Sequence, residues 1–132
     1  MKVIYQLFVN GIPKAQPRPR MTAKGHVYNP HSASAWKEEI KAAFRSCLKP
    51  IITVPVILRV SFFLPKPKSM KKNKDNLNVP HAKKPDTDNL LKALKDAMTE
   101  AQVWKDDSQV YKIEVAKFYS EETGAQIIVE TF

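Results

Sequence analysis

Four aspartates and one lysine in the second half of the chain have the residue types and spacing of a metal-dependent hydrolytic site. Asp86 and Asp88 stand in the segment PDTDN, Lys92 follows Asp88 by four residues, and Asp106 and Asp107 stand together in WKDDSQV. Carboxylate oxygens bind hard ions such as Mg²⁺, which activate water and contact a phosphate oxygen. A nearby lysine offsets the charge that grows on that phosphate in the transition state. The set predicts a metal-assisted phosphodiesterase, provided that the fold brings the acids together.

Each acidic pair, taken alone, also has an ordinary structural interpretation. Asp at the start of a helix is a common cap, and Asp-Asp-Ser between a helix and a strand is a common turn. The helix expected between the pairs would be roughly 20 Å long, so the pairs meet only if the chain doubles back to the helix start. Carboxylates clustered in this way repel one another, and without metal at least one pKa should rise. Asp96 lies two turns beyond Asp88 and is expected to pair with Lys92.

The overall charge predicts a polyanionic partner. Lys and Arg outnumber Asp and Glu by 22 to 13, with a formal net charge of +9 and a pI near 9.7. Such a balance is typical of proteins that bind nucleic acid or an anionic surface. The single cysteine, Cys47, cannot form an internal disulfide, which fits a reducing compartment. The apolar first residues are too short to span a membrane. The expectation is a cytoplasmic protein with no membrane partner.

The elements that must position these residues follow from hydrophobic periodicity. A length of 132 residues with 43% hydrophobic residues favours one domain over residues 1–132. Period-two and period-3.6 patterns predict strands at 2–10, 54–65, 109–119 and 125–132, a short strand near 25–29, and helices at 32–49 and 88–101. The first strand has apolar residues on both faces and is expected inside the sheet. The last two strands are expected to form a hairpin through 120–124. The prediction is an α+β fold, with two helices packed on a mixed or mostly antiparallel sheet.

Two basic segments are candidates for DNA contact. One is the proline-rich stretch 11–25, and the other is a lysine-rich stretch at about 65–84, which is expected to be a flexible loop. For any single cation in them, the alternative is an ordinary solvated surface charge. The candidate phosphate contacts are Lys14, Arg18, Arg20, Lys71, Lys72, Lys74, Lys83 and Lys84.

The segment PDTDNLLKALKDAMTEAQVWKDDSQV resembles the signature of the RusA family of Holliday junction resolvases, in which Asp-x-Asp-Asn is followed by Lys and later by Asp-Asp-x-Gln-Val. The resemblance implies that Asp86, Asp88 and Asp107 hold the metal and that Lys92 joins them in catalysis. It implies supporting roles for Asp106 and Asn89. It also implies a RusA-like endonuclease domain over the chain.

The resemblance further implies a substrate and an assembly. The expected activity is that of an endodeoxyribonuclease that uses Mg²⁺, or Mn²⁺ in its place, to resolve four-way junction DNA by paired symmetric nicks in recombination and repair. A junction offers two equivalent cleavage points about a twofold axis, so a homodimer is expected. Tyr111, Tyr119 or Phe132 could contribute to its interface, although burial in the core is the favoured interpretation. The alternative function is a noncatalytic basic module that coats nucleic acid.

Overall fold

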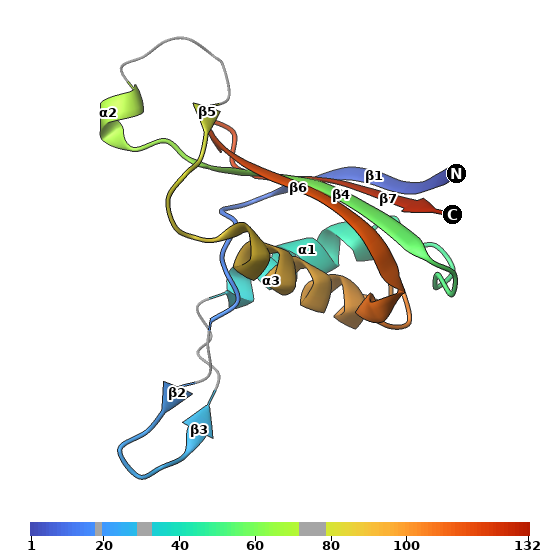
Figure 1. Ribbon diagram of the computed structural model, residues 1–132, viewed down its shortest axis with the longest axis horizontal. Helices are drawn as coiled ribbons and strands as arrows, with labels where there is room; N and C mark the ends of the chain where they lie inside the picture. Colours follow the sequence, from blue (N-terminus) through green and yellow to red (C-terminus); the bar gives the residue numbers. More distant parts are fainter. Residues whose placement is uncertain (18–19, 29–32, 72–78) are drawn as a thin grey trace.

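A mixed five-stranded sheet with two long helices on one face forms the body of the protein. The computed structural model describes residues 1–17, 20–28, 33–71 and 79–132. Their elements are β1 (Lys2–Asn10), β2 (Arg20–Met21), β3 (Val27–Tyr28), α1 (Ser34–Arg45), β4 (Val56–Pro65), α2 (Lys68–Lys71), β5 (Val79–Pro80), α3 (Thr87–Glu100), the 3-10 turn η1 (Asp107–Gln109), β6 (Val110–Ser120) and β7 (Gly124–Thr131). The strand order is β1-β7-β4-β6-β5 (Figure 1). The predicted α+β fold is confirmed.

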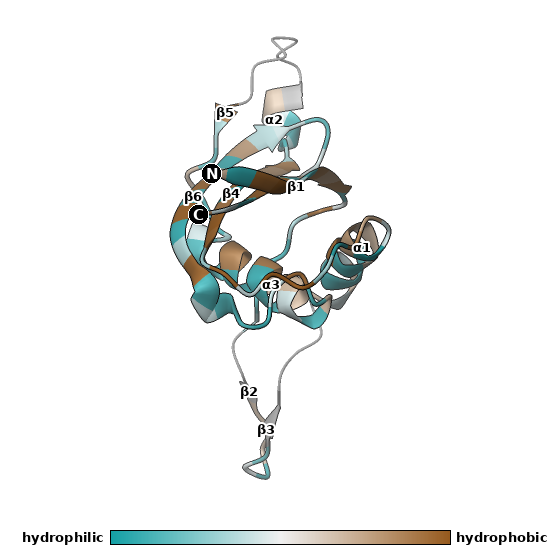
Figure 2. Ribbon diagram, turned by 90° about the vertical axis from the view of Figure 1, so that its right-hand side faces the viewer, coloured by the Kyte–Doolittle hydropathy of each residue, from teal (hydrophilic) through white to brown (hydrophobic). Residues whose placement is uncertain are grey.

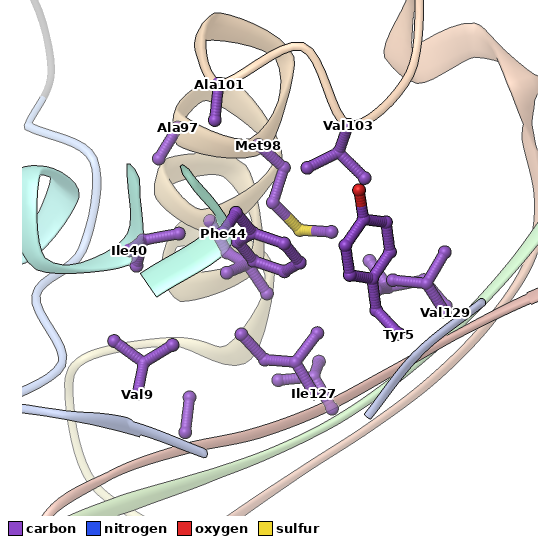
Figure 3. Packing of buried hydrophobic residues seen from close by; sticks show 14 of the residues in the cluster. Tyr5, Val9, Ile40, Phe44, Ala97, Met98, Ala101, Val103, Ile127 and Val129 are labelled. Atoms are coloured by element: carbon purple, nitrogen blue, oxygen red, sulfur yellow. The ribbon is translucent and has the colours of Figure 1, made fainter. Parts of the chain in front are cut away.

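The core lies between the sheet and the helices α1 and α3. Every second residue of β4 faces the helices, and both helices carry apolar residues at the 3.6-residue spacing that turns one side inward. Figure 2 shows the two helices on the same side of the sheet. In Figure 3 the aromatic rings of Tyr5 and Phe44 lie beside Met98, Ile127 and Val129. None of the helices in these ranges is long and apolar enough to cross a membrane.

The tryptophans and the other aromatics differ in burial. Trp36 and Trp104 are buried, and the Trp104 Nε1–H donates to the Thr99 hydroxyl at 2.7 Å. Core positions for Tyr111 and Phe132 are wrong, because these side chains are 53% and 85% exposed. Their rings pack on each other edge to face at 6.2 Å, away from the main core.

The sheet order corrects two expectations. β1 is an edge strand, paired only with β7 within the described residues, rather than an interior one. β6 and β7 do not form a hairpin, because β4 lies between them, parallel to β6 and antiparallel to β7. The link between β6 and β7 must therefore cross two interstrand spacings, roughly 10 Å, which a few extended residues can span. β4 takes the centre because its buried positions include Ile57, on the face away from the helices.

The first helix is shorter than its pattern. α1 ends at Arg45, with Ser46 as its C-cap, so Cys47 and Leu48 lie beyond it and are exposed. An apolar residue at helical spacing is buried only while the helix continues, and α1 ends at Arg45, five residues before Pro50.

The two basic segments form small projecting elements. β3, expected near 25–29, pairs with β2 in a separate two-stranded sheet rather than at the edge of the main one. Within the stretch 65–84, the described residues form the one-turn helix α2 and the short strand β5. In Figures 1 and 2 the β2–β3 hairpin extends beyond the helices, and α2 extends beyond the sheet. Flexibility of the stretch stays a prediction.

Replacing the α1 residue at the centre of the core should destabilise the fold. Phe44→Ala removes a ring that is 0% exposed and packs edge to face on Tyr5 at 5.2 Å. We expect a loss of about 3–5 kcal/mol in the free energy of unfolding, measured by urea denaturation. Leu48→Ala, at an exposed site after the helix, is the control and should change it by less than about 0.5 kcal/mol. Equal losses in the two variants would contradict the core assignment.

Candidate metal-dependent nuclease site

The first acidic pair stands at the start of α3 with its carboxylates free. Asp86 is the N-cap residue, in an extended conformation, and its carbonyl accepts from the Leu90 N–H at 3.0 Å. Its side chain makes no capping hydrogen bond. Asp88 follows in the first turn, and both side chains are exposed. The side chain of an N-cap aspartate normally accepts a hydrogen bond from a backbone N–H of the helix. The Asp86 carboxylate does not, so it is available to a ligand. Two carboxylates that could bind a metal ion, those of Asp86 and Asp88, thus lie at the positive end of the helix dipole in an exposed position.

The segment before Asp86 is held by one lysine of the sheet. The Lys117 ammonium, on β6, donates to the carbonyls of Lys83 and Pro85, the latter at 2.7 Å. The Lys117 carbonyl in turn accepts from the His81 N–H at 3.1 Å. The His81 ring lies 4.3 Å from that of Tyr119, and burial together with the charge of Lys117 lowers the pKa of His81. The chain therefore enters α3 from a fixed position on the sheet.

The proline-rich segment lies against the same helix end. The Gln16 N–H donates to the Asn89 carbonyl at 3.0 Å. A hollow at the surface is lined by Ala15, Lys84, Pro85, Asp86 and Asn89. A second hollow shares Ala15, Lys84 and Pro85 with the first and adds Lys14. Two of the predicted phosphate contacts, Lys14 and Lys84, thus share their surroundings with the predicted metal ligand Asp86.

The remaining predicted site residues near the start of α3 include two exposed lysines, Lys83 and Lys92. Lys92 is exposed and stands one turn after Asp88 on the polar side of α3. Asp96 does not pair with it, because its carboxylate lies 3.9 Å from the Lys37 ammonium on α1. Lys83 is exposed. Predicted contacts that lie outside the described residues, or whose side chains do, are Arg18, Arg20, Lys71, Lys72 and Lys74.

The second acidic pair stands in a turn with a dense hydrogen-bond network. Asp106 caps η1, and its carboxylate accepts from the Ser108 N–H at 3.1 Å. The Gln109 carbonyl oxygen accepts from the Lys105 and Asp106 N–H groups, at 2.9 Å each, while its amide donates to the carbonyls of Ile52 and Val54. The hydrogen bond from Ser108 lowers the pKa of Asp106, whereas clustering predicted a rise. Asp107 follows, half-buried.

The two acidic pairs do not meet within one chain. α3 separates them, and its 14 residues measure about 21 Å. Asp106 and Asp107 follow the C-terminal end of the helix, where η1 begins. β6 then carries the chain back, so that Lys117, rather than an acid, reaches the start of α3. Among the described residues, no three His, Cys, Asp or Glu side chains are placed to hold one metal ion.

Three positioning residues were not predicted from the sequence. Gln109 had a local signal, because Asp106 and Gln109 have the spacing of a capping box. Gln16 and Lys117 had none, since their partners lie far away along the chain.

The start of α3 presents two exposed carboxylates, Asp86 and Asp88, close to Lys14 and Lys84. The sequence model of the family described as Endodeoxyribonuclease RusA matches residues 10–130, so the chain belongs to the RusA family of Holliday junction resolving endodeoxyribonucleases. Nucleases of this family depend on divalent metal ions. The chain is also 38% identical to the uncharacterized protein YqaN of Bacillus subtilis (strain 168), over 92% of each chain.

Loss of the Gln109 side chain should loosen the second acidic turn. Gln109→Ala leaves the Lys105 and Asp106 amides and two carbonyls of the 52–54 segment without this partner. We expect the free energy of unfolding to fall by about 1–3 kcal/mol in urea denaturation. Gln6→Ala, at an exposed position of β1, is the matched control and should be neutral within about 0.5 kcal/mol. A neutral Gln109→Ala would contradict the anchoring role.

Proposed function

We propose that this protein is an Mg²⁺-dependent nuclease that cuts four-way DNA junctions by paired nicks in recombination and repair, with Mn²⁺ able to replace Mg²⁺. The observation that carries the proposal is the pair of uncommitted carboxylates, Asp86 and Asp88, at an exposed helix start in a chain of the RusA family. Acting on DNA is consistent with a cytoplasmic location and with the net charge of +9.

The proposed ligand set is Asp86, Asp88 and Asp107. The chemistry of the donors fits a hard divalent ion, because all are carboxylates and Asp86 and Asp88 are solvent-exposed. The distance along α3 means that one chain supplies Asp86 and Asp88 to a site and cannot add its own Asp107. A second copy of the chain supplies the missing aspartate. Each of the two sites in the homodimer then draws on both copies, which matches the two equivalent cleavage points of a junction.

The chain's own residues have separate tasks in the proposed reaction. When bound, a divalent ion would polarise the scissile phosphate and lower the pKa of the attacking water. Lys92 places its ammonium beside the phosphate and offsets the negative charge that develops there. Asp106 orients Asp107 through the turn that it caps, and Asn89 orients the carboxylates on either side of the helix start.

The lysines around the first acidic pair are proposed as phosphate contacts. Lys14 and Lys84 line hollows next to Asp86, and Lys83 is exposed just before it. The β2–β3 hairpin and α2 lie on the same side of Figure 1 as the start of α3, and they project in opposite directions from it. This end can therefore present cations on both sides of a bound backbone. Arg18, Arg20, Lys71, Lys72 and Lys74 belong to the segments that carry these elements and are proposed as further contacts.

Neutralising either end of the proposed site should stop cutting. With a synthetic four-way junction and Mg²⁺, Asp88→Asn and Asp107→Asn should each reduce nicking by about 100-fold or more, since each removes a metal ligand. Junction binding, measured by gel shift, should stay equal or become tighter, because a negative charge is lost near phosphate. Asp96→Asn on the same helix is the control and should cut normally. Wild-type protein that binds without cutting would support the noncatalytic alternative.

A mixture of the two inactive variants tests whether the site is shared between copies. In a heterodimer of Asp88→Asn with Asp107→Asn, one shared site carries both substitutions and the other carries neither. The mixture should therefore regain nicking of one strand per junction, measured on junctions labelled on each strand in turn. If every site belonged to a single copy, both sites of the heterodimer would be damaged and the mixture would stay inactive. That outcome would overturn the shared site and leave the family assignment untouched.

A further inference from the structure

A further hollow, here called the α1 hollow, lies between the end of β1 and the start of α1. Its lining comes from the last residue of β1 and the residues after it, and from the first turns of α1. Its volume is about 470 Å³, within the range of roughly 300–1,000 Å³ that is usual for ligand pockets. Of the proposed site residues, Lys14 lines it and the aspartates do not.

One wall of the α1 hollow is apolar and fixed by packing. Trp36 is 2% exposed, so its ring is held in place by the core. Gly11 lies directly against that ring, where an added Cβ would stand 3.1 Å from Trp36 Cε3, and its φ of +142° is one that glycine adopts without strain. Ile12, with 49% of its side chain exposed, and the exposed Ala35 complete the apolar lining. An occupant therefore finds apolar surface to cover.

The polar groups of the α1 hollow favour an occupant that donates hydrogen bonds. Asn10 and Glu39 line it and are exposed. In the described part of the chain Glu39 enters no ion pair, whereas the neighbouring Glu38 lies 2.9 Å from the Lys41 ammonium. A carboxylate repels a phosphate group but accepts from an amino group. A flat, partly apolar group with an amino substituent fits this lining, and cytosine, adenine and guanine are such groups, whereas thymine has no amino group.

The α1 hollow is linked to the proposed cutting site by one short segment. Lys14 lines this hollow and also the one that contains Lys84, and Ala15 lines the hollow that contains Asp86. Ile12 and Ala15 are three residues apart, which is at most about 10 Å of chain. A DNA strand advances about 3.4 Å per nucleotide in a duplex. The α1 hollow is therefore within a few nucleotides of a phosphate placed at Asp86.

We propose that the α1 hollow receives one base that has left the stack of the bound DNA, an inference that rests on the proposed function for its substrate. The base covers Ile12 and Ala35 and directs its amino group to Glu39, while Lys14 contacts the phosphate between the base and the cutting site. Removing a base from the stack is least costly where pairing or stacking is already disturbed, as it is where the strands of a junction cross. The hollow thus selects DNA in which a base is free to leave the stack.

The fluorescent base analogue 2-aminopurine tests whether a base enters the α1 hollow. The analogue brightens when it leaves the stack, so it is placed in turn at each position within a few nucleotides of the crossing point of a synthetic junction. The measurement uses the full chain in buffer without divalent metal ions. Saturating wild-type protein should raise the fluorescence at one position by about threefold or more.

Two tryptophan substitutions on α1 show whether the brightening depends on the hollow. Ala35→Trp fills the hollow and should remove the increase. Ala42→Trp makes the same change at an exposed position about two turns further along the helix, outside the hollow, and should keep it. Ile12→Ala removes apolar surface at an exposed site after β1 and should weaken the increase, which guards against misfolding of the first variant. The absence of any bright position, an increase that survives Ala35→Trp, or one that Ala42→Trp also removes would overturn the proposal.

Glu39→Gln tests the preference for an amino group. Wild-type affinity is compared by gel shift between junctions with cytosine and with thymine at the bright position. Because a glutamine amide both donates and accepts, the ratio of the two affinities should fall about threefold in Glu39→Gln. Glu38→Gln, at the neighbouring exposed position, is the control and should keep the wild-type ratio. An unchanged ratio in Glu39→Gln would remove this residue from the proposed contact with the base.

These measurements need DNA binding but no cutting, so the two proposals fail in different ways. Failure of the proposed function appears as a junction that brightens with the protein and stays intact in Mg²⁺. Failure of the base site appears as a junction that is nicked in Mg²⁺ although no position brightens.

Discussion

Burial of one face of α3 against the sheet sets the distance between the two acidic segments. Leu90, Leu94 and Met98 are fully buried along this face, so the helix cannot shift or bend without uncovering the core. Asp86 and Asp88 are consequently held at one end and Asp106 and Asp107 at the other, about a helix length apart. The packed helix α3 therefore fixes the separation between the two acidic pairs.

The order and direction of the strands decide which residue lies next to the start of α3. β4 lies in the centre, and β6 runs parallel to it from the second acidic turn back to the start of α3. The residue that arrives there is Lys117, which bonds to the carbonyls of Lys83 and Pro85 and thereby fixes the approach to Asp86. One strand thus begins at one half of the proposed site and ends at the other half.

Positive charge is unevenly distributed over the protein. Positive charge accumulates in the segments near the start of α3, with Lys14, Lys83 and Lys84 close to Asp86. On the face of the sheet away from the helices, Arg59 instead lies 3.2 Å from Glu130 and 3.3 Å from Glu114, which balances the charge locally. A basic end suited to a phosphate backbone and a charge-balanced face of the sheet therefore occur in one small basic protein.

The sequence by itself determined the features that depend on near neighbours along the chain. The period of apolar residues located α1, α3 and the four long strands, and the Asp-x-Asp-Asn and Asp-Asp-x-Gln-Val segments pointed to the RusA family, which the family comparison bears out. The tertiary structure alone decided which strands are neighbours. It put β1 at an edge and β4 between β6 and β7, because the order of the strands is set by contacts between residues that are far apart along the chain. It also decided that the acids of one chain stand apart and that Lys117 meets the start of α3, since those relations are set by the length of a packed helix and the direction of a distant strand.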